Sequence, residues 1–300
     1  MKFPTTAVTS IAFALLAAPV LSATSLHTWV SGTGSDANTG TRISPYATFA
    51  TAIANTTAGG IVSAVDSGDF GAITILKAIT IDGGSSGATI SFTSSEAIYI
   101  GAGPTDTVIL RHLTITGLGA GPDAIFLSSG QNLIIEDCIV ENFTDIGLGI
   151  GSSAAANVVV KNTVITGGSL GLRVYQGPGP NRISLRGVTI SGASSVAVFV
   201  RSGLMEISDS LITMSNIALE VDTNATISVA NSVLSYNGTD SLPFSPSTIL
   251  LSNNNTWFAN NGTGGGGGTA LRVNTGPVAA GFRIAAPAVV PDDVPRPRRQ

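Results

Sequence analysis

VILRHLTITG (Val108–Gly117) recurs five times along this chain, as LIIEDCIVEN (Leu133–Asn142), VVVKNTVITG (Val158–Gly167), ISLRGVTISG (Ile183–Gly192), MEISDSLITM (Met205–Met214) and ISVANSVLSY (Ile227–Tyr236). Successive copies start 25, 25, 25, 22 and 22 residues apart. A period of this length indicates stacked supersecondary units, none of which can bury its apolar side alone.

Each copy predicts two short strands separated by a bend. Positions one, three and eight are almost always apolar, whereas position five holds residue types that tolerate a turn or left-handed backbone. The residues at position five are His112, Asp137, Asn162, Gly187, Asp209 and Asn231. A further alternating run predicts another strand about 15 residues after each start. These runs are AIFL (Ala124–Leu127), GLGI (Gly147–Ile150), GLRV (Gly171–Val174), AVFV (Ala197–Val200) and ALEV (Ala218–Val221).

The repeat therefore predicts an all-β fold, a single-stranded right-handed parallel β-helix. Leucine-rich repeats have a similar period, but their fixed Leu and Asn spacing is missing here, and no unit has room for a helix between its strands. Small polar corners and few charges fit a β-helix, and its right-handedness follows from the rule for parallel crossovers.

Composition excludes several classes of function. The chain has 300 residues, a mean hydropathy of +0.40 and only 11% charged residues, as a long shared aliphatic core would give. Beyond the N-terminus no run of 18 apolar residues occurs, so no membrane span is predicted. The formal net charge of −4 argues against a nucleic-acid-binding surface. The single cysteine, Cys138, excludes an internal disulfide and is predicted to be a packed thiol.

The chain is expected to comprise four segments. Residues 1–23 (Met1–Ala23) have the short apolar core of a secretory signal peptide, with a membrane anchor as the alternative, so we expect a secreted protein. Residues 24–60 would form an N-terminal cap, residues 61–273 the β-helix and residues 274–300 a flexible tail with Pro and Arg. The cap should contain a helix over Pro45–Asn55, N-capped by Ser44 and ended by Gly59-Gly60.

The start of the mature chain resembles a known family. The resemblance is carried by Trp29-Val30, GSDANTG (Gly34–Gly40), PYATF (Pro45–Phe49), Ala52-Ile53, Gly59-Gly60 and GDF (Gly68–Phe70). These stretches resemble the opening of secreted bacterial right-handed β-helix proteins of the pectate-lyase-like superfamily, and the likeness extends over roughly residues 27–260. It implies the fold rather than an activity, since that superfamily contains lyases, epimerases, hydrolases and proteins without known activity. Its hydrolases and calcium-dependent lyases use several clustered acidic residues, and this chain has no recognisable catalytic motif of that kind.

One face of the predicted β-helix concentrates charged and aromatic residues. If the aliphatic residues of the last strand in each unit point inward, the residues between them point outward and stack from coil to coil. This places six candidate binding residues on three consecutive coils: Arg173, Tyr175, Phe199, Arg201, Glu220 and Asp222. Aromatic rings stack on sugars, and arginine pairs with the carboxylates of uronic acids. The loop insertion expected at Asn237–Ser247 would wall this face on one side.

Two chemical roles follow for this face. Arg201 is the candidate catalytic base, because β-helix lyases often use an arginine or lysine base. Glu220 and Asp222 are candidate ligands for Ca²⁺, and no other cofactor is expected. The alternative is an ordinary exposed face on which Arg201 pairs with Glu220 or Asp222 across coils.

Two further outward columns stand out. Charges alternate at the start of the column Arg111, Glu136, Lys161 and Arg186, which predicts ion pairs between coils. Ile109, Ile134 and Val159 form an apolar column. It is covered by another segment, for which Thr269–Ile284 is the candidate, or else marks a partner surface.

These observations leave two hypotheses for function. The first is a non-catalytic extracellular scaffold or polysaccharide-binding protein. The second is a polysaccharide lyase, or a related enzyme, that acts on uronic-acid glycans. In both a polysaccharide is the expected partner and the protein is expected to be a monomer.

Overall fold

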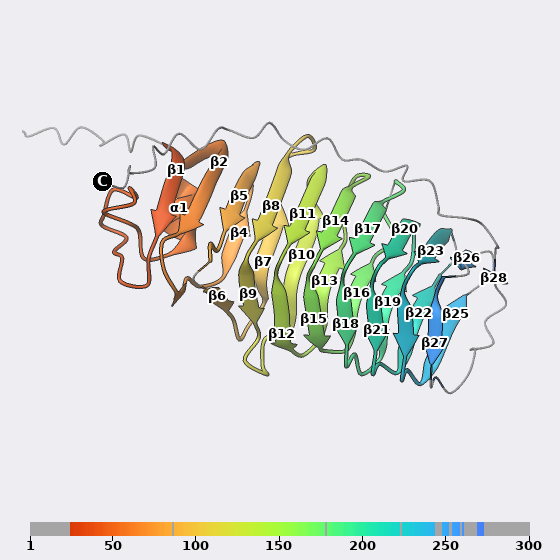
Figure 1. Ribbon diagram of the computed structural model, residues 1–300. Coiled ribbons are helices and arrows are strands. Elements are labelled where there is room, and N and C mark those ends of the chain that lie inside the picture. The colour runs from red at the N-terminus through yellow and green to blue at the C-terminus, as the bar shows by residue number, and fades with distance from the viewer. Residues whose placement is uncertain are drawn as a thin grey trace, which may run out of the picture.

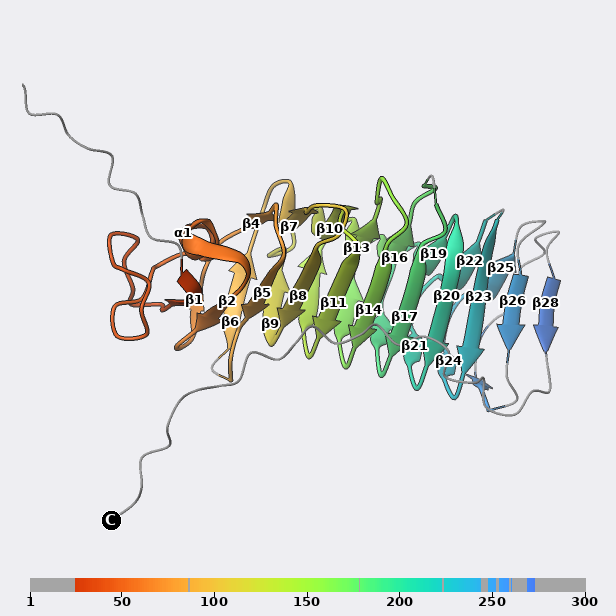
Figure 2. The same cartoon turned by 90° about the horizontal axis from the view of Figure 1, so that it is seen from above.

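The protein is a rod built from three parallel sheets. The computed structural model describes residues 25–85, 87–177, 179–222, 224–243, 248–251, 254–258, 260 and 269–272. Between Thr56 and Pro243 each turn of the chain adds one strand to every sheet, so the strands stack along the rod (Figures 1 and 2). The predicted parallel β-helix is therefore confirmed. The predicted signal peptide (1–23) and flexible tail (274–300) lie outside the described residues.

Three sheets hold the strands in the order in which the chain visits them. Sheet 1 has eleven strands: β1 (Ser25–Val30), β2 (Thr56–Ala64), β5 (Ile79–Asp82), β8 (Thr107–Arg111), β11 (Asn132–Glu136), β14 (Asn157–Lys161), β17 (Arg182–Arg186), β20 (Gly203–Ser208), β23 (Ala225–Ala230), β26 (Thr248–Leu251) and β28 (Thr269–Arg272). Sheet 2 has nine: β3 (Gly68–Asp69), β6 (Ala88–Ser91), β9 (Leu113–Thr116), β12 (Ile139–Phe143), β15 (Val164–Gly167), β18 (Thr189–Ser191), β21 (Leu211–Thr213), β24 (Val233–Ser235) and β27 (Thr256–Phe258). Sheet 3 has eight: β4 (Ile73–Ile75), β7 (Glu96–Gly101), β10 (Asp123–Ser129), β13 (Ile146–Ile150), β16 (Leu170–Val174), β19 (Val196–Val200), β22 (Ile217–Val221) and β25 (Thr239–Pro243).

The predicted bend separates sheet 1 from sheet 2. His112, Asp137 and Asn162 have φ angles of 55°, 53° and 46°, in the left-handed region. Gly187, Asp209 and Asn231 also have positive φ. Only glycine adopts this geometry freely, and Asn and Asp tolerate it better than other residues. The residue at position five therefore sets the corner of each coil.

A single apolar core fills the space between the sheets. Leu110, Ile135 and Val160 lie opposite one another in successive strands of sheet 1, and each is at most 1% exposed. Removing a buried aliphatic side chain of this kind typically costs about 2–5 kcal/mol. Stacking of coils thus buries the apolar face that no single repeat could bury alone.

The helix at the N-terminal end of the rod is shorter than predicted. α1 covers Phe49–Asn55 and buries Phe49, Ala52 and Ile53 against the core (Figure 2). Its N-cap is Thr48, whose side chain accepts a hydrogen bond from the Thr51 N–H, so the predicted start at Pro45 after Ser44 is wrong.

Strand pairing explains this later start. The Tyr46 N–H donates to the Trp29 carbonyl at 2.9 Å, and the Ser31 N–H donates to the Tyr46 carbonyl at 3.0 Å. Residue 46 is therefore held extended beside β1 and cannot be helical. The predicted end at Gly59-Gly60 is also wrong, because the helix ends at Asn55 and both glycines lie inside β2.

The stretch predicted to be a loop insertion, Asn237–Ser247, continues the repeat instead. Thr239–Pro243 forms β25, which pairs with β22 in sheet 3, while residues 244–247 lie outside the described residues. Pro243 suggested a loop because it cannot donate to a strand ladder. It is tolerated here because β25 is the last described strand of its sheet, where one side needs no partner. The strand extends sheet 3, and the rest of the predicted wall lies outside the described residues.

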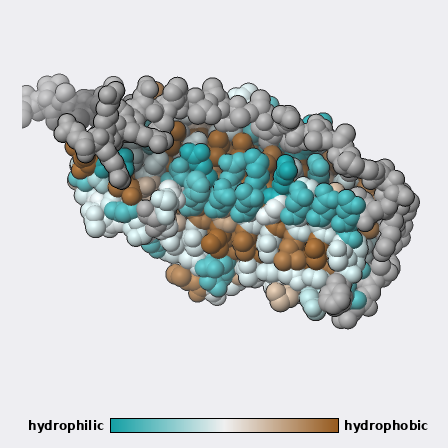
Figure 3. All heavy atoms as spheres, in the orientation of Figure 1, coloured by the Kyte–Doolittle hydropathy of each residue, from teal (hydrophilic) through white to brown (hydrophobic). Residues whose placement is uncertain are grey.

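The outer surfaces of sheets 1 and 2 differ in polarity. Figure 3 shows a hydrophilic band over sheet 1 and hydrophobic patches below it, over sheet 2. Three exposed apolar residues of sheet 2 are Ile139, Val164 and Val233. No helix in the described part of the chain is long and apolar enough to cross a membrane.

The predicted apolar column on sheet 1 is aligned across three strands. Ile134 lies opposite Ile109 and Val159 and is 8% exposed, whereas its two neighbours are half-buried. The proposed cover, Thr269–Ile284, is described only at its start. Residues 269–272 form β28, which pairs with β26 and does not lie over the column, and residues 273–284 fall outside the described residues.

Candidate functional site

The outer face of sheet 3 brings the six predicted site residues together. Arg173, Phe199 and Glu220 lie opposite one another on β16, β19 and β22. Tyr175, Arg201 and Asp222 follow the ends of the same strands. Their backbone N–H groups extend the ladder, donating to the carbonyls of the preceding coil at 2.9, 3.0 and 2.8 Å. The two columns predicted from alternation are therefore adjacent on one surface.

Arg173 is held between two aromatic rings. Its Cζ atom lies 4.3 Å from the centroid of the Tyr175 ring and 5.6 Å from that of Phe199. Both distances fall within the range of cation–π attraction. Its Nε atom is buried and has no hydrogen-bond partner among the described residues.

Two aromatic residues that were not predicted as site residues extend this surface. The Phe126 ring centroid lies 6.3 Å from that of Tyr99 and 6.0 Å from that of Tyr175, the latter edge to face. Figure 1 shows the strands that carry them, β7 and β10, stacked beside β13 and β16. We call Tyr99, Phe126, Tyr175 and Phe199, which are all half-buried, the aromatic row.

Two glycines make the aromatic row continuous. A Cβ atom at Gly149 would lie 2.7 Å from Cδ2 of Phe126, and one at Gly151 would lie 2.9 Å from its Cζ. The Phe126 ring therefore covers the coil between its own and that of Tyr175. An outward Phe followed by outward Gly on the next coil is the sequence signal that could have identified Phe126.

A small apolar cluster supports the row from one side. Ile146, Leu170 and Val196 are buried in a cluster separate from the central core, and Tyr175 and Phe199 pack against it. Rings fixed by packing lose little conformational entropy when a ligand binds.

Arg201 is engaged in an ion pair with the next coil. Its Nε atom lies 3.0 Å from Oδ2 of Asp222, with the two side chains 39% and 26% exposed. This is the pairing that the alternative interpretation predicted. Burial raises the pKa of the neighbouring Glu220; the charge of Asp222 raises it further, and the charge of Arg173 opposes both.

Acidic residues also lie along the opposite edge of the row. Asp123 in β10 lies opposite Glu96 in β7. The Oδ1 atom of Asp123 accepts a hydrogen bond from the Ile146 N–H at 3.2 Å. Burial raises the pKa of Asp123. The hydrogen bond from Ile146 and the charge of Arg173 act against this, and the charges of Asp145 and Glu96 add to it.

The predicted calcium ligands do not form a recognisable metal centre. Ca²⁺ takes six to eight oxygen ligands, usually from several carboxylates. No group of three or more His, Cys, Asp or Glu side chains suitable for a metal occurs among the described residues. Glu220 and Asp222 are only two, and Asp222 already binds Arg201.

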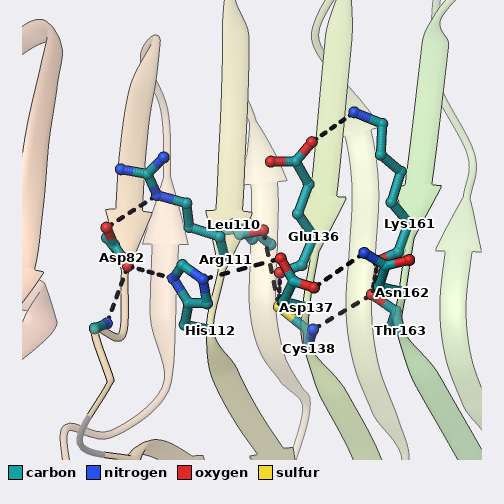
Figure 4. Close-up of polar contacts among 11 residues, drawn as sticks. Asp82, Leu110, Arg111, His112, Glu136, Asp137, Cys138, Lys161, Asn162 and Thr163 are labelled. Carbon is teal, nitrogen blue, oxygen red and sulfur yellow. Dashed lines mark hydrogen bonds and ion pairs between the residues drawn. The ribbon is translucent and has the colours of Figure 1, made fainter.

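The second charged column lies on sheet 1, away from this face, and forms ion pairs between coils (Figure 4). Lys161 Nζ lies 2.7 Å from Oε1 of Glu136, as alternation predicted, whereas Arg111 pairs with Asp82 at 2.9 Å. Arg186 lies 3.5 Å from Asp209. These contacts form a row of ion pairs between neighbouring coils on an exposed surface.

At the adjacent corner His112 lies between two carboxylates (Figure 4). Its Nδ1 atom is 2.8 Å from Asp82 Oδ1 and its Nε2 atom 3.9 Å from Asp137 Oδ2. Cys138 lies behind this corner at 1% exposure, where burial raises the pKa of its thiol to about 12. The thiol donates to the Glu136 carbonyl at 3.3 Å, so it is packed, as the sequence predicted.

Comparisons with known proteins agree with this architecture. A family model described as "Right handed beta helix region" matches residues 52–211. A search of curated proteins found no match.

Three solved structures are similar. A complex of XylC with xylose has a TM-score of 0.63 at 10% identity, over 79% of this chain and 67% of that chain. Pectate lyase Pel9A has a TM-score of 0.48 at 14% identity, over 82% and 78% of the two chains. A rhamnogalacturonan lyase has a TM-score of 0.37 at 11% identity, over 76% and 74%. At these identities the likeness concerns the fold alone.

Proposed function

The chain belongs to the right-handed β-helix family, and from that premise we propose that it is a secreted, non-catalytic polysaccharide-binding protein. Its glycan would lie along the aromatic row of sheet 3. The observation that carries the proposal is the continuity of that row, from Tyr99 through Phe126 to Tyr175 and Phe199. Secretion is proposed from the apolar stretch at Met1–Ala23.

The dimensions of the row suit an extended glycan. It runs from β7 to β19 through β10, β13 and β16, which is four inter-strand steps of about 4.8 Å, or roughly 19 Å. That length accommodates several pyranose rings laid along the rod axis. Half-buried rings present the apolar faces on which sugar C–H groups stack, and Arg173 provides a hydrogen-bond donor between two of them.

The geometry around Arg201 favours binding over eliminative cleavage. A lyase base must face the proton it removes, but Nε of Arg201 is directed to Asp222 at 3.0 Å. The Asp222 carboxylate also offsets part of the positive charge with which a substrate carboxylate would pair. The similarity to XylC, which was solved with xylose, is a similarity of fold. It therefore gives only general support to a carbohydrate role.

A binding test on purified protein examines the proposal. Wild type should bind at least one polysaccharide in affinity electrophoresis and calorimetry. Phe126→Ala should weaken that binding by about 30-fold, because a central aromatic anchor contributes about 2 kcal/mol. The matched control is Tyr236→Ala, since Tyr236 is an exposed aromatic residue at the end of sheet 2, away from the row. Circular dichroism of each variant checks the fold.

Two results would overturn the proposal. Ultraviolet absorbance of an unsaturated product that rises with wild type and disappears in Arg201→Ala would establish a lyase. Absence of binding across a broad panel of polysaccharides would leave a structural rod without a glycan site.

A further inference from the structure

We infer that the glycan is a neutral polysaccharide rather than a polymer of uronic acids, an inference that rests on the proposed function because it concerns the same face. It departs from the expectation that Arg173 and Arg201 recognise uronic-acid carboxylates. Three features of sheet 3 carry it: an excess of carboxylates, an arginine that is already paired with an acid, and acceptor groups suited to sugar hydroxyls.

Carboxylates outnumber cations on this face. Between β7 and β22 the residues around the aromatic row are five acids and two bases, a net charge of −3: Glu96, Asp123, Asp145, Glu220 and Asp222 against Arg173 and Arg201. The acids lie on both sides of the rings. A polyanion laid along the row would approach this negative charge over its whole length, and like charges brought together at an interface repel each other.

One of the two arginines is already paired with an acid, and the other is held between aromatic rings. Asp222 binds Arg201 at 3.0 Å. Arg173 is held between Tyr175 and Phe199, and its charge already acts on Asp123 and Glu220. A uronate that pairs with Arg201 would share the guanidinium with Asp222, and the two carboxylates would repel each other.

The carboxylates suit a neutral sugar instead. Burial raises the pKa values of both Asp123 and Glu220, and nearby acids raise them further. An additional anion would increase that repulsion. The hydroxyl groups of a neutral pyranose are donors, and hydrogen bonds from hydroxyls to carboxylates are among the stronger ones. The rings hold the sugar faces while the flanking acids accept hydrogen bonds from the sugar edges.

The test compares neutral and acidic oligosaccharides of equal length. Calorimetry would use hexamers of xylose, glucose and mannose on one side, and of galacturonate and mannuronate on the other. At least one neutral hexamer should bind at least about tenfold more tightly than every acidic one, a difference of about 1.4 kcal/mol. Its affinity should change little with salt, because binding forms no new ion pair.

A charge variant adds an internal check. Asp222→Asn releases Arg201 and should raise the affinity for the acidic hexamers about tenfold. The matched control is Asp209→Asn, which removes the carboxylate 3.5 Å from Arg186 on sheet 1 and should alter binding to neither class.

The outcomes separate the two proposals. Tight, salt-sensitive binding of acidic hexamers by wild type would overturn the neutral-glycan inference while upholding a glycan-binding face. Failure of Asp222→Asn to improve acidic binding would contradict the role assigned to the carboxylates. No binding of any hexamer or polymer would reject the proposed function itself.

Discussion

Glu220 shows how a single residue on the candidate binding face can lower the stability of the folded state at neutral pH. Because burial and Asp222 raise its pKa, the folded state binds a proton more tightly than the unfolded state. The stability that this provides is present below the ordinary pKa of 4.5 and is lost as the pH rises through the raised value. At neutral pH the ionised group therefore disfavours folding.

Glu220→Gln should for this reason increase the free energy of unfolding at pH 7 and change it little near pH 3. Urea denaturation at the two pH values measures the difference. Glu136→Gln is the control, because that carboxylate is paired with Lys161 and its removal should not stabilise. Equal stabilisation at both pH values would show that packing, rather than charge, is responsible.

At the residue scale the sequence predicted the alignment of part of the candidate face. Period-two alternation placed Arg173, Phe199 and Glu220 in one column, and their backbone register agrees. Alternation predicts to which side of the sheet each side chain points. It does not predict how far that side chain extends over the neighbouring coil. Alternation therefore could not predict that the Phe126 ring lies over Gly149.

The corner between sheets 1 and 2 illustrates electrostatics at the scale of an element. Burial alone would raise the pKa of Asp82. Hydrogen bonds from His112 and from the Gly84 N–H, together with the charges of Arg111 and His112, lower it below its ordinary value of 3.8. A carboxylate with a lowered folded pKa stabilises the protein above its unfolded pKa, and this contribution is lost as the pH falls.

Asp82→Asn should therefore reduce stability at pH 7 and flatten the loss of stability below about pH 4. Thermal melts of wild type and variant from neutral to acidic pH measure both effects. Glu206→Gln, on the outer face of β20 in the same sheet, serves as a control that should keep the wild-type profile. An unchanged acid limb in Asp82→Asn would show that other carboxylates govern acid unfolding.

Element boundaries were harder to predict than element types, for identifiable reasons. Ser44-Pro45 has the local features of a helix start, but pairing of Tyr46 with β1 outweighs local preference. Pro243 has the local features of a loop, but the end of a sheet tolerates it. In both cases a partner distant in sequence decides the conformation, and local propensity contains no information about that partner.

The whole molecule is quasi-one-dimensional, since each strand pairs only with its neighbours along the rod. Stability is then a sum of coil and interface contributions, and the effect of a substitution depends on its position along the axis. Ile135 in β11 and Ile249 in β26 provide a matched pair, because both are buried in sheet 1 with exposures of 1% and 0%.

Ile135→Ala should lower the midpoint of the main unfolding transition, because β11 joins the coils on either side of it through β8 and β14. Ile249→Ala removes the same methyl and methylene groups, worth about 2–5 kcal/mol in a core, but β26 has only β28 beyond it among the described strands. Its effect should be confined to faster amide exchange in β26 and β23, with little change in the main midpoint. Calorimetry combined with hydrogen exchange resolved by peptide would measure both quantities. Equal midpoint shifts for the two variants would show that the rod unfolds as one cooperative unit, and the additive description of its coils would then be wrong.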